Sequence, residues 1–89
     1  EAERIGIVNK VGAAEEVDAA VAEWATKLAS KSPILMRLGK DAMYRQQDLP
    51  FEQALELLQH NLTLALSTDD VVEGVTAFFE KREPNWKGH

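Results

Sequence analysis

Apolar residues recur every three or four positions from residue 15 to residue 82, and polar residues fill the positions between them. This spacing is typical of amphipathic helices, whose apolar face repeats about every 3.6 residues. The pattern predicts four helices, at residues 15–31, 33–47, 51–66 and 69–82. The third has the clearest apolar face, which consists of Phe51, Ala54, Leu55, Leu58, Leu62, Ala65 and Leu66. We therefore predict an all-α fold for most of the chain.

Polar residues and prolines mark the ends of the later helices. Ser32 precedes Pro33, Asp48 precedes Leu49-Pro50, and Thr68 precedes two acidic residues. Ser, Thr and Asp side chains cap free N–H groups, proline suits the first helical turn, and acidic groups complement the positive end of a helix. Pro84 is predicted to end the fourth helix, since proline cannot continue one.

The first 14 residues follow a different pattern. Charged helix formers lead into Gly6, which suggests a helix end because glycine tolerates the left-handed conformation of such a cap. Residues 7–11 form a β-branched run that predicts one short strand. A single strand leaves its edge unpaired, so we expect its sheet in another part of a longer protein. Residues 1–14 are thus predicted to end a core domain, and residues 15–89 to form a helical domain.

Composition and charge exclude several classes of function. A chain of 89 residues with 45% hydrophobic residues is composed like a small globular domain with a thin core. The absence of cysteine rules out disulfides, thiolate nucleophiles and cysteine-ligated metals. A net charge of −5 opposes binding to a nucleic-acid backbone, so we expect no nucleic-acid partner. No apolar run approaches the roughly 20 residues that cross a bilayer, and no basic-then-apolar leader opens the sequence, so we expect no membrane segment.

Two of the predicted helices are apolar on a second side. Met36 and Met43 lie seven apart on the second helix, and Leu57 and Leu64 lie seven apart on the third, both away from the main apolar faces. These residues either fill the flank of a wide core or contact another subunit or domain. Because a thin core cannot cover two faces, we favour a contact with another subunit or domain.

No residues are spaced like a catalytic or metal-binding group. His60 and His89 have no carboxylate or second histidine at metal-ligand spacing, and no serine lies in a nucleophile elbow. The carboxylate pairs at 15–16, 52 and 56, and 69–70 are explained by helix starts or a solvated helix face. We predict no catalytic residue, no metal and no cofactor in this chain. Gly74 interrupts the fourth helix at a cost of about 1 kcal/mol, which suggests that another backbone or a ligand approaches it.

One pair of residues at the end of the fourth helix could bind a ligand. Phe78 and Lys81 lie three apart, which would make an aromatic ring and an ammonium neighbours on the helix surface. Such a pair can stack a base and bind a phosphate. From the residues alone we favour the alternative, in which Phe78 belongs to the core while Lys81 and Arg82 only complement the negative helix end.

The whole sequence resembles the C-terminal third of crotonase-superfamily enzymes, the enoyl-CoA hydratase and isomerase family. The N-terminal marks are Ile5-Gly6-Ile7-Val8-Asn9-Lys10-Val11, in place of a Gly-Leu-Val-Asn-x-Val strand, then Ala22, Ala25, Leu28 and Ala29 before Ser32-Pro33. The later marks are Lys40, Asp70, Glu73-Gly74, Ala77-Phe78, Glu80-Lys81-Arg82, Pro84 and Trp86. Trp86 stands where many relatives have phenylalanine, and Ile5 and Ile7 replace frequent variants of the strand.

The resemblance implies a division of roles between this sequence and a larger N-terminal part. In such enzymes a spiral of ββα turns holds the oxyanion hole and the catalytic glutamates, none of which this sequence contains. The C-terminal helices pack the subunits into trimers, often paired into hexamers, and help to close the acyl-CoA site. The resemblance assigns Lys81 to the ribose 3′-phosphate of CoA and Phe78 to the surroundings of the adenine, and it reverses the preference for the core interpretation.

The reaction itself stays open at this point. Hydratases, isomerases, dehalogenases and decarboxylases of the superfamily share this ending, and a hydratase would add water to a trans-2-enoyl thioester in fatty acid metabolism. Such an enzyme would work in a bacterial cytoplasm or a mitochondrial matrix. The alternative is a stand-alone helical interaction module without enzymatic activity, which would bury its apolar faces against a partner.

Overall fold

The computed structural model describes all residues from 1 to 89 and contains helices but no strand, which confirms the all-α fold class. The chain forms two compact units, Glu1–Ser30 and Lys31–His89. The first unit contains a short 3-10 helix, η1 (Ala14–Glu16), and α1 (Val17–Ala29). The second contains α2 (Pro33–Gln46), α3 (Phe51–Leu66) and α4 (Asp69–Glu80). The domain boundary after residue 14 stays a prediction.

The predicted strand at residues 7–11 is wrong for this chain, because these residues form bends and irregular backbone. A strand exists only when its edge is paired, and these residues have no partner strand here. The predicted helix cap before it is confirmed. Gly6 adopts a left-handed conformation with φ of +84°, and the N–H of Ile7 donates to the carbonyl of Ala2 at 2.9 Å. This six-to-one bond is the mark of a Schellman cap.

The apolar face of α1 is present but exposed within the first unit. Val17, Val21 and Trp24 lie on one side of α1, and none of them is buried. Together with Asn9, Lys10 and Gly12 of the preceding segment they line an open hollow of about 310 Å³. The amphipathic pattern thus predicts the helix correctly, while the first unit by itself supplies no core for it.

Local capping explains where the helices of the second unit begin. The Ser32 hydroxyl accepts a hydrogen bond from the N–H of Leu35 at 3.3 Å, and Thr68 accepts one from Val71 at 3.3 Å, so both predicted caps are confirmed. The predicted cap at Asp48 is wrong. Pro50 is the residue before α3, and no side chain caps that helix. The carbonyl of Pro50 instead accepts the first hydrogen bond of this helix, from the N–H of Ala54 at 2.9 Å.

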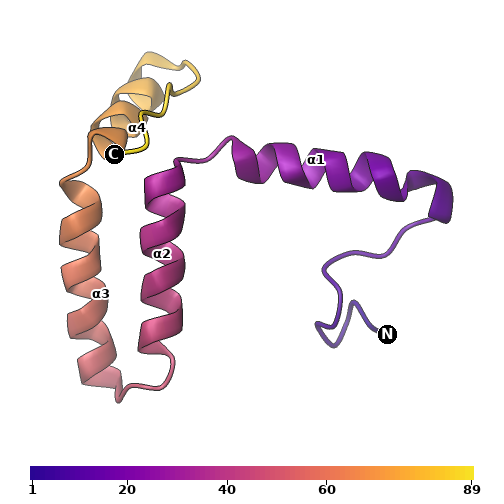
Figure 1. The fold of residues 1–89 in the computed structure, drawn as a ribbon, viewed down its shortest axis with the longest axis horizontal. Helices are drawn as coiled ribbons and strands as arrows, with labels where there is room; N and C mark the ends of the chain where they lie inside the picture. The colour runs from indigo at the N-terminus through magenta and orange to yellow at the C-terminus, as the bar shows by residue number, and fades with distance from the viewer. The chain divides into compact units, whose positions relative to one another are not determined.

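In the second unit α2 and α3 run antiparallel side by side, and α4 crosses one end of this hairpin (Figure 1). Only small apolar residues are buried, namely Ala42, Ala54 and Ala77, which confirms the expectation of a thin core. The larger residues of the main apolar face of α3, such as Leu55 and Leu62, stay exposed. None of the four helices has the length and apolar character needed to span a membrane.

The fourth helix ends earlier than predicted. It stops at Glu80, and the next residue, Lys81, adopts a left-handed conformation with φ of 56° and ψ of 43°. The N–H of Arg82 donates to the carbonyl of Ala77 at 3.0 Å, and the N–H of Lys81 donates to that of Phe78 at 3.3 Å. These bonds form a second Schellman cap, which breaks the helix before Pro84 can do so.

Candidate functional site

The buried face of α4 is made of acidic and small residues. Asp70, Glu73, Gly74 and Ala77 follow the i, i+3, i+4, i+7 spacing of one helix face, and all four are buried or half-buried. The more apolar residues of the helix lie on the other faces, where Val75, Phe78 and Phe79 are exposed. The helix therefore turns the acidic residues Asp70 and Glu73 inward and leaves its apolar surface exposed in this chain.

Phe78 lies outside the core of this chain. Its side chain is 78% exposed and that of Phe79 is 76% exposed, and the two rings meet edge to face with their centroids 5.7 Å apart. The alternative that placed Phe78 in the core therefore does not hold within this chain. An exposed aromatic pair of this kind offers a surface on which a planar group can stack.

Lys81 follows Phe78 closely, though not as a residue of the same helix. The hydrogen bond from its N–H to the carbonyl of Phe78 keeps the two backbones together after the helix has ended. The Lys81 side chain is exposed and forms no hydrogen bond or ion pair. A non-glycine residue in the left-handed region is uncommon and costs about 1 kcal/mol or more relative to glycine. Such strained residues cluster at functional sites.

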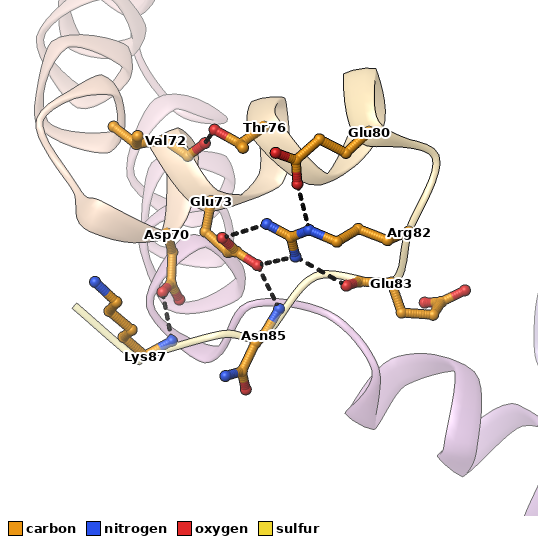
Figure 2. Close-up of polar contacts among 9 residues, drawn as sticks. All are labelled: Asp70, Val72, Glu73, Thr76, Glu80, Arg82, Glu83, Asn85 and Lys87. Atoms are coloured by element: carbon orange, nitrogen blue, oxygen red, sulfur yellow. Dashed lines mark hydrogen bonds and ion pairs between the residues drawn. The ribbon is translucent and has the colours of Figure 1, made fainter.

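Arg82 is held by two carboxylates (Figure 2). Its guanidinium donates to both carboxylate oxygens of Glu73, at 2.6 and 3.1 Å, and its Nε donates to Glu80 at 2.6 Å. The Arg82 hydrogen bonds, followed by the backbone N–H of Asn85 at 2.7 Å, lower the pKa of Glu73 from 4.5 to about 2. Hydrogen bonds from the guanidinium to Glu73 and Glu80 raise the pKa of Arg82.

The C-terminal segment folds back along α4 onto the same face. A Cβ atom added to Gly74 would lie 3.1 Å from the Trp86 ring, so the group that approaches this glycine is an indole. The sequence suggested a backbone or a ligand at this position, and the close group is instead a side chain. Glycine leaves room for the ring, because an added Cβ atom would lie closer to it than ordinary van der Waals contact.

Asp70 ties three segments together. Its side chain is 0% exposed and accepts a hydrogen bond from the Ser32 hydroxyl at 2.6 Å. The same carboxylate accepts two more hydrogen bonds from the C-terminal segment, one from the N–H of Lys87 at 2.7 Å and one from the N–H of Gly88. Burial raises the pKa of this carboxyl, but the three hydrogen bonds outweigh burial and hold the pKa below its ordinary value. The sequence pattern placed Asp70 at the start of α4, and the family resemblance counted it among its marks, but neither predicted its burial. The spacing of the small and acidic residues on this helix was the signal that could have revealed it.

The other predicted residues lie outside this cluster. Met36 and Met43 are exposed on α2, while on α3 Leu64 is exposed and Leu57 half-buried. His60 is exposed, and His89 lies 3.3 Å from Asp69 in an exposed pair. No three His, Asp or Glu side chains come together in an arrangement that could hold a metal ion.

Comparison with known proteins links this arrangement to one family. The enoyl-CoA hydratase/isomerase family model matches residues 1–89. The crotonyl-CoA hydratase of Syntrophomonas wolfei is 37% identical over 86 residues, which are 97% of this chain and 33% of that protein. A probable mitochondrial enoyl-CoA hydratase of Dictyostelium discoideum is 33% identical over 97% of this chain and 31% of its own length. The crystal structure of an enoyl-CoA hydratase from Bacillus anthracis superposes with a TM-score of 0.91 at 32% identity, over 99% of this chain and 34% of that one. The chain thus spans about one third of the length of these relatives.

Proposed function

The chain belongs to the enoyl-CoA hydratase/isomerase family, and from this premise we propose that it forms the helical part of an enzyme that acts on acyl-CoA thioesters. In this proposal the chain contributes one side of the CoA nucleotide site and a contact between subunits, while the catalytic glutamates lie in another part of the enzyme. The observation that carries the proposal is the pairing of exposed Phe78 with an unpaired Lys81 that is held in a left-handed conformation.

The chemistry of the two side chains suits a CoA nucleotide. An ammonium and a phosphate form a charge-assisted hydrogen bond, which is about twice as strong as a neutral one. The Lys81 ammonium would bind the ribose 3′-phosphate, and the Phe78 ring would pack near the adenine. Glycine would fit position 81 at lower conformational cost, and a ligand for the ammonium explains why lysine occupies it.

The phosphate assignment is tested with two ligands that differ only in that group. Binding of CoA and of 3′-dephospho-CoA to the full-length protein is measured by calorimetry for the wild type and for Lys81→Ala. The substitution should weaken CoA binding about tenfold and leave 3′-dephospho-CoA binding almost unchanged. Equal losses for the two ligands would refute the assignment of Lys81 to the phosphate.

The subunit contact is assigned to Leu57, Leu64, Met36 and Met43, and the proposed assembly is a trimer or a hexamer. Leu64 and Met43 are the best probes because they are exposed, whereas Leu57 is half-buried in its own chain. Replacing both exposed residues with lysine should shift the assembly toward monomers in light scattering, since unpaired charges would be buried at the contact. Phe51→Lys, a charge placed on a third exposed apolar residue, should leave the assembly unchanged. An unchanged oligomer in the double variant would remove these residues from the contact.

A further inference from the structure

Two adjacent cations follow α4, and the structure gives them opposite environments. Lys81 makes no side-chain contact with an acid, whereas the Arg82 guanidinium is shared between Glu73 and Glu80 (Figure 2). By sequence alone both residues would qualify as phosphate ligands. The geometry separates them, because Arg82 has already used its Nε and both terminal nitrogens on carboxylates and on the carbonyl of Glu83.

We propose that Glu73 and Arg82 are positioning residues that hold Lys81 in its left-handed conformation and keep its ammonium available to the nucleotide 3′-phosphate. This inference rests on the proposed CoA site and adds to it the residues that preorganise it. Arg82 acts on the ligand only through Lys81 and is not itself a phosphate ligand.

The first part of the argument is conformational. Lys81 can keep its left-handed backbone only if the residues after it are fixed, because the unstrained alternative for lysine is a helical or extended backbone. The Arg82 side chain runs back along α4 to Glu73, which lies nine positions earlier, and the same carboxylate accepts the N–H of Asn85 at 2.7 Å. Glu73 therefore fastens residues 82 and 85 to the helix. Its side chain is only 17% exposed, so this attachment is partly shielded from water.

The second part of the argument is electrostatic. Glu80 directly precedes Lys81, and a free carboxylate there would attract the ammonium and repel a phosphate. Arg82 binds this carboxylate through Nε at 2.6 Å, so that oxygen of Glu80 is directed at the guanidinium and not at Lys81. The guanidinium is shared by two carboxylates and is not available to a ligand, so the Lys81 ammonium is the positive charge that a phosphate can reach. The ion pairs of Arg82 thus leave the ammonium free of a competing internal partner.

The experiment measures the ratio of the dissociation constants of 3′-dephospho-CoA and CoA for the full-length protein. Glu73→Gln keeps the shape of the side chain and removes its charge, and Arg82→Gln removes the guanidinium. Each should lower the ratio about threefold, as expected for the loss of a partly exposed ion pair, with binding of 3′-dephospho-CoA nearly unchanged. Arg82→Lys should restore part of the ratio, because lysine supplies the charge without the bidentate geometry. Lys27→Gln is the matched control: it removes one exposed cation, 3.8 Å from Glu23 on α1, and should leave the ratio unchanged.

A double variant separates a positioning role from direct contact. In the Lys81→Ala background, Arg82→Gln should cause no further fall in the ratio, because no ammonium remains to be positioned. A further fall would make Arg82 a phosphate ligand and overturn the inference. Unchanged ratios in both Glu73→Gln and Arg82→Gln, with a lowered ratio in Lys81→Ala, would also overturn it while leaving the proposed function intact. An unchanged ratio in Lys81→Ala itself would overturn the phosphate site and this inference together.

Discussion

Gly74→Ala provides a direct test of how α4 and the C-terminal segment are packed. In the interior of an unobstructed helix this substitution stabilises by about 1 kcal/mol, because alanine loses less conformational freedom than glycine. At position 74, however, the new methyl group would lie 3.1 and 3.2 Å from two atoms of the Trp86 ring. These distances are shorter than ordinary van der Waals contact, so the ring would have to move.

The ring has little freedom to move because its neighbours on both sides are fastened to α4. The N–H of Asn85 donates to Glu73 at 2.7 Å, and the N–H of Lys87 donates to Asp70 at 2.7 Å. Overpacking a constrained site costs about 1–3 kcal/mol, which exceeds the gain in helix propensity. We therefore expect Gly74→Ala to destabilise the protein by about 1 kcal/mol net.

Two further variants make the reasoning refutable. Gly39→Ala lies inside α2, where an added Cβ meets nothing within 4 Å, so it should stabilise by about 1 kcal/mol. With the ring removed by Trp86→Leu, Gly74→Ala should become stabilising relative to Trp86→Leu alone. Urea unfolding and hydrogen exchange of the α4 amides measure both effects. If Gly74→Ala stabilises the protein in the presence of Trp86, the close packing of the ring on this helix is wrong.

Two other predictions concern the contacts of Asp70 and Glu73, the acidic residues on the inner face of α4. Ser32→Ala removes both the cap of α2 and the hydrogen bond to buried Asp70. It should lower the free energy of unfolding, measured by urea titration, by about 2 kcal/mol. The control, Ser67→Ala at an exposed serine, should change this free energy by less than about 0.5 kcal/mol. The pKa of Glu73 is lowered from 4.5 to about 2, so its ion pair stabilises the fold above pH 4.5 and this stabilisation is lost as the pH falls toward 2. The Glu73→Gln variant should accordingly melt at a lower temperature than the wild type at pH 7, and the difference should narrow toward pH 2. An equal difference at both pH values would exclude Glu73 as the titrating group.

Local signals in the sequence were sufficient for the helices and for several of their ends. The caps at Ser32 and Thr68 and the glycine cap at Gly6 depend on residues within a few positions of one another, so their chemistry can be inferred from neighbours alone. The spacing of Phe78 and Lys81 is local too, but by itself it favoured a core position for Phe78, and only the family resemblance indicated a ligand site. The structure adds that Lys81 lies outside the helix, a consequence of the Schellman bond between Arg82 and Ala77.

Only the tertiary structure decided which face of α4 is buried. The apolar pattern favoured Val71, Val75 and Phe78, of which only Val71 is half-buried. The inner face is formed instead by Asp70, Glu73, Gly74 and Ala77. The reason is that the C-terminal segment folds back on this side, with backbone N–H groups that need acceptors and an indole that needs space. Ser32 meets Asp70 across 38 positions of sequence, a distance over which no local pattern operates. The predicted strand at residues 7–11 is wrong for a related reason: a strand needs hydrogen bonds to a partner strand, and residues 7–11 have none here.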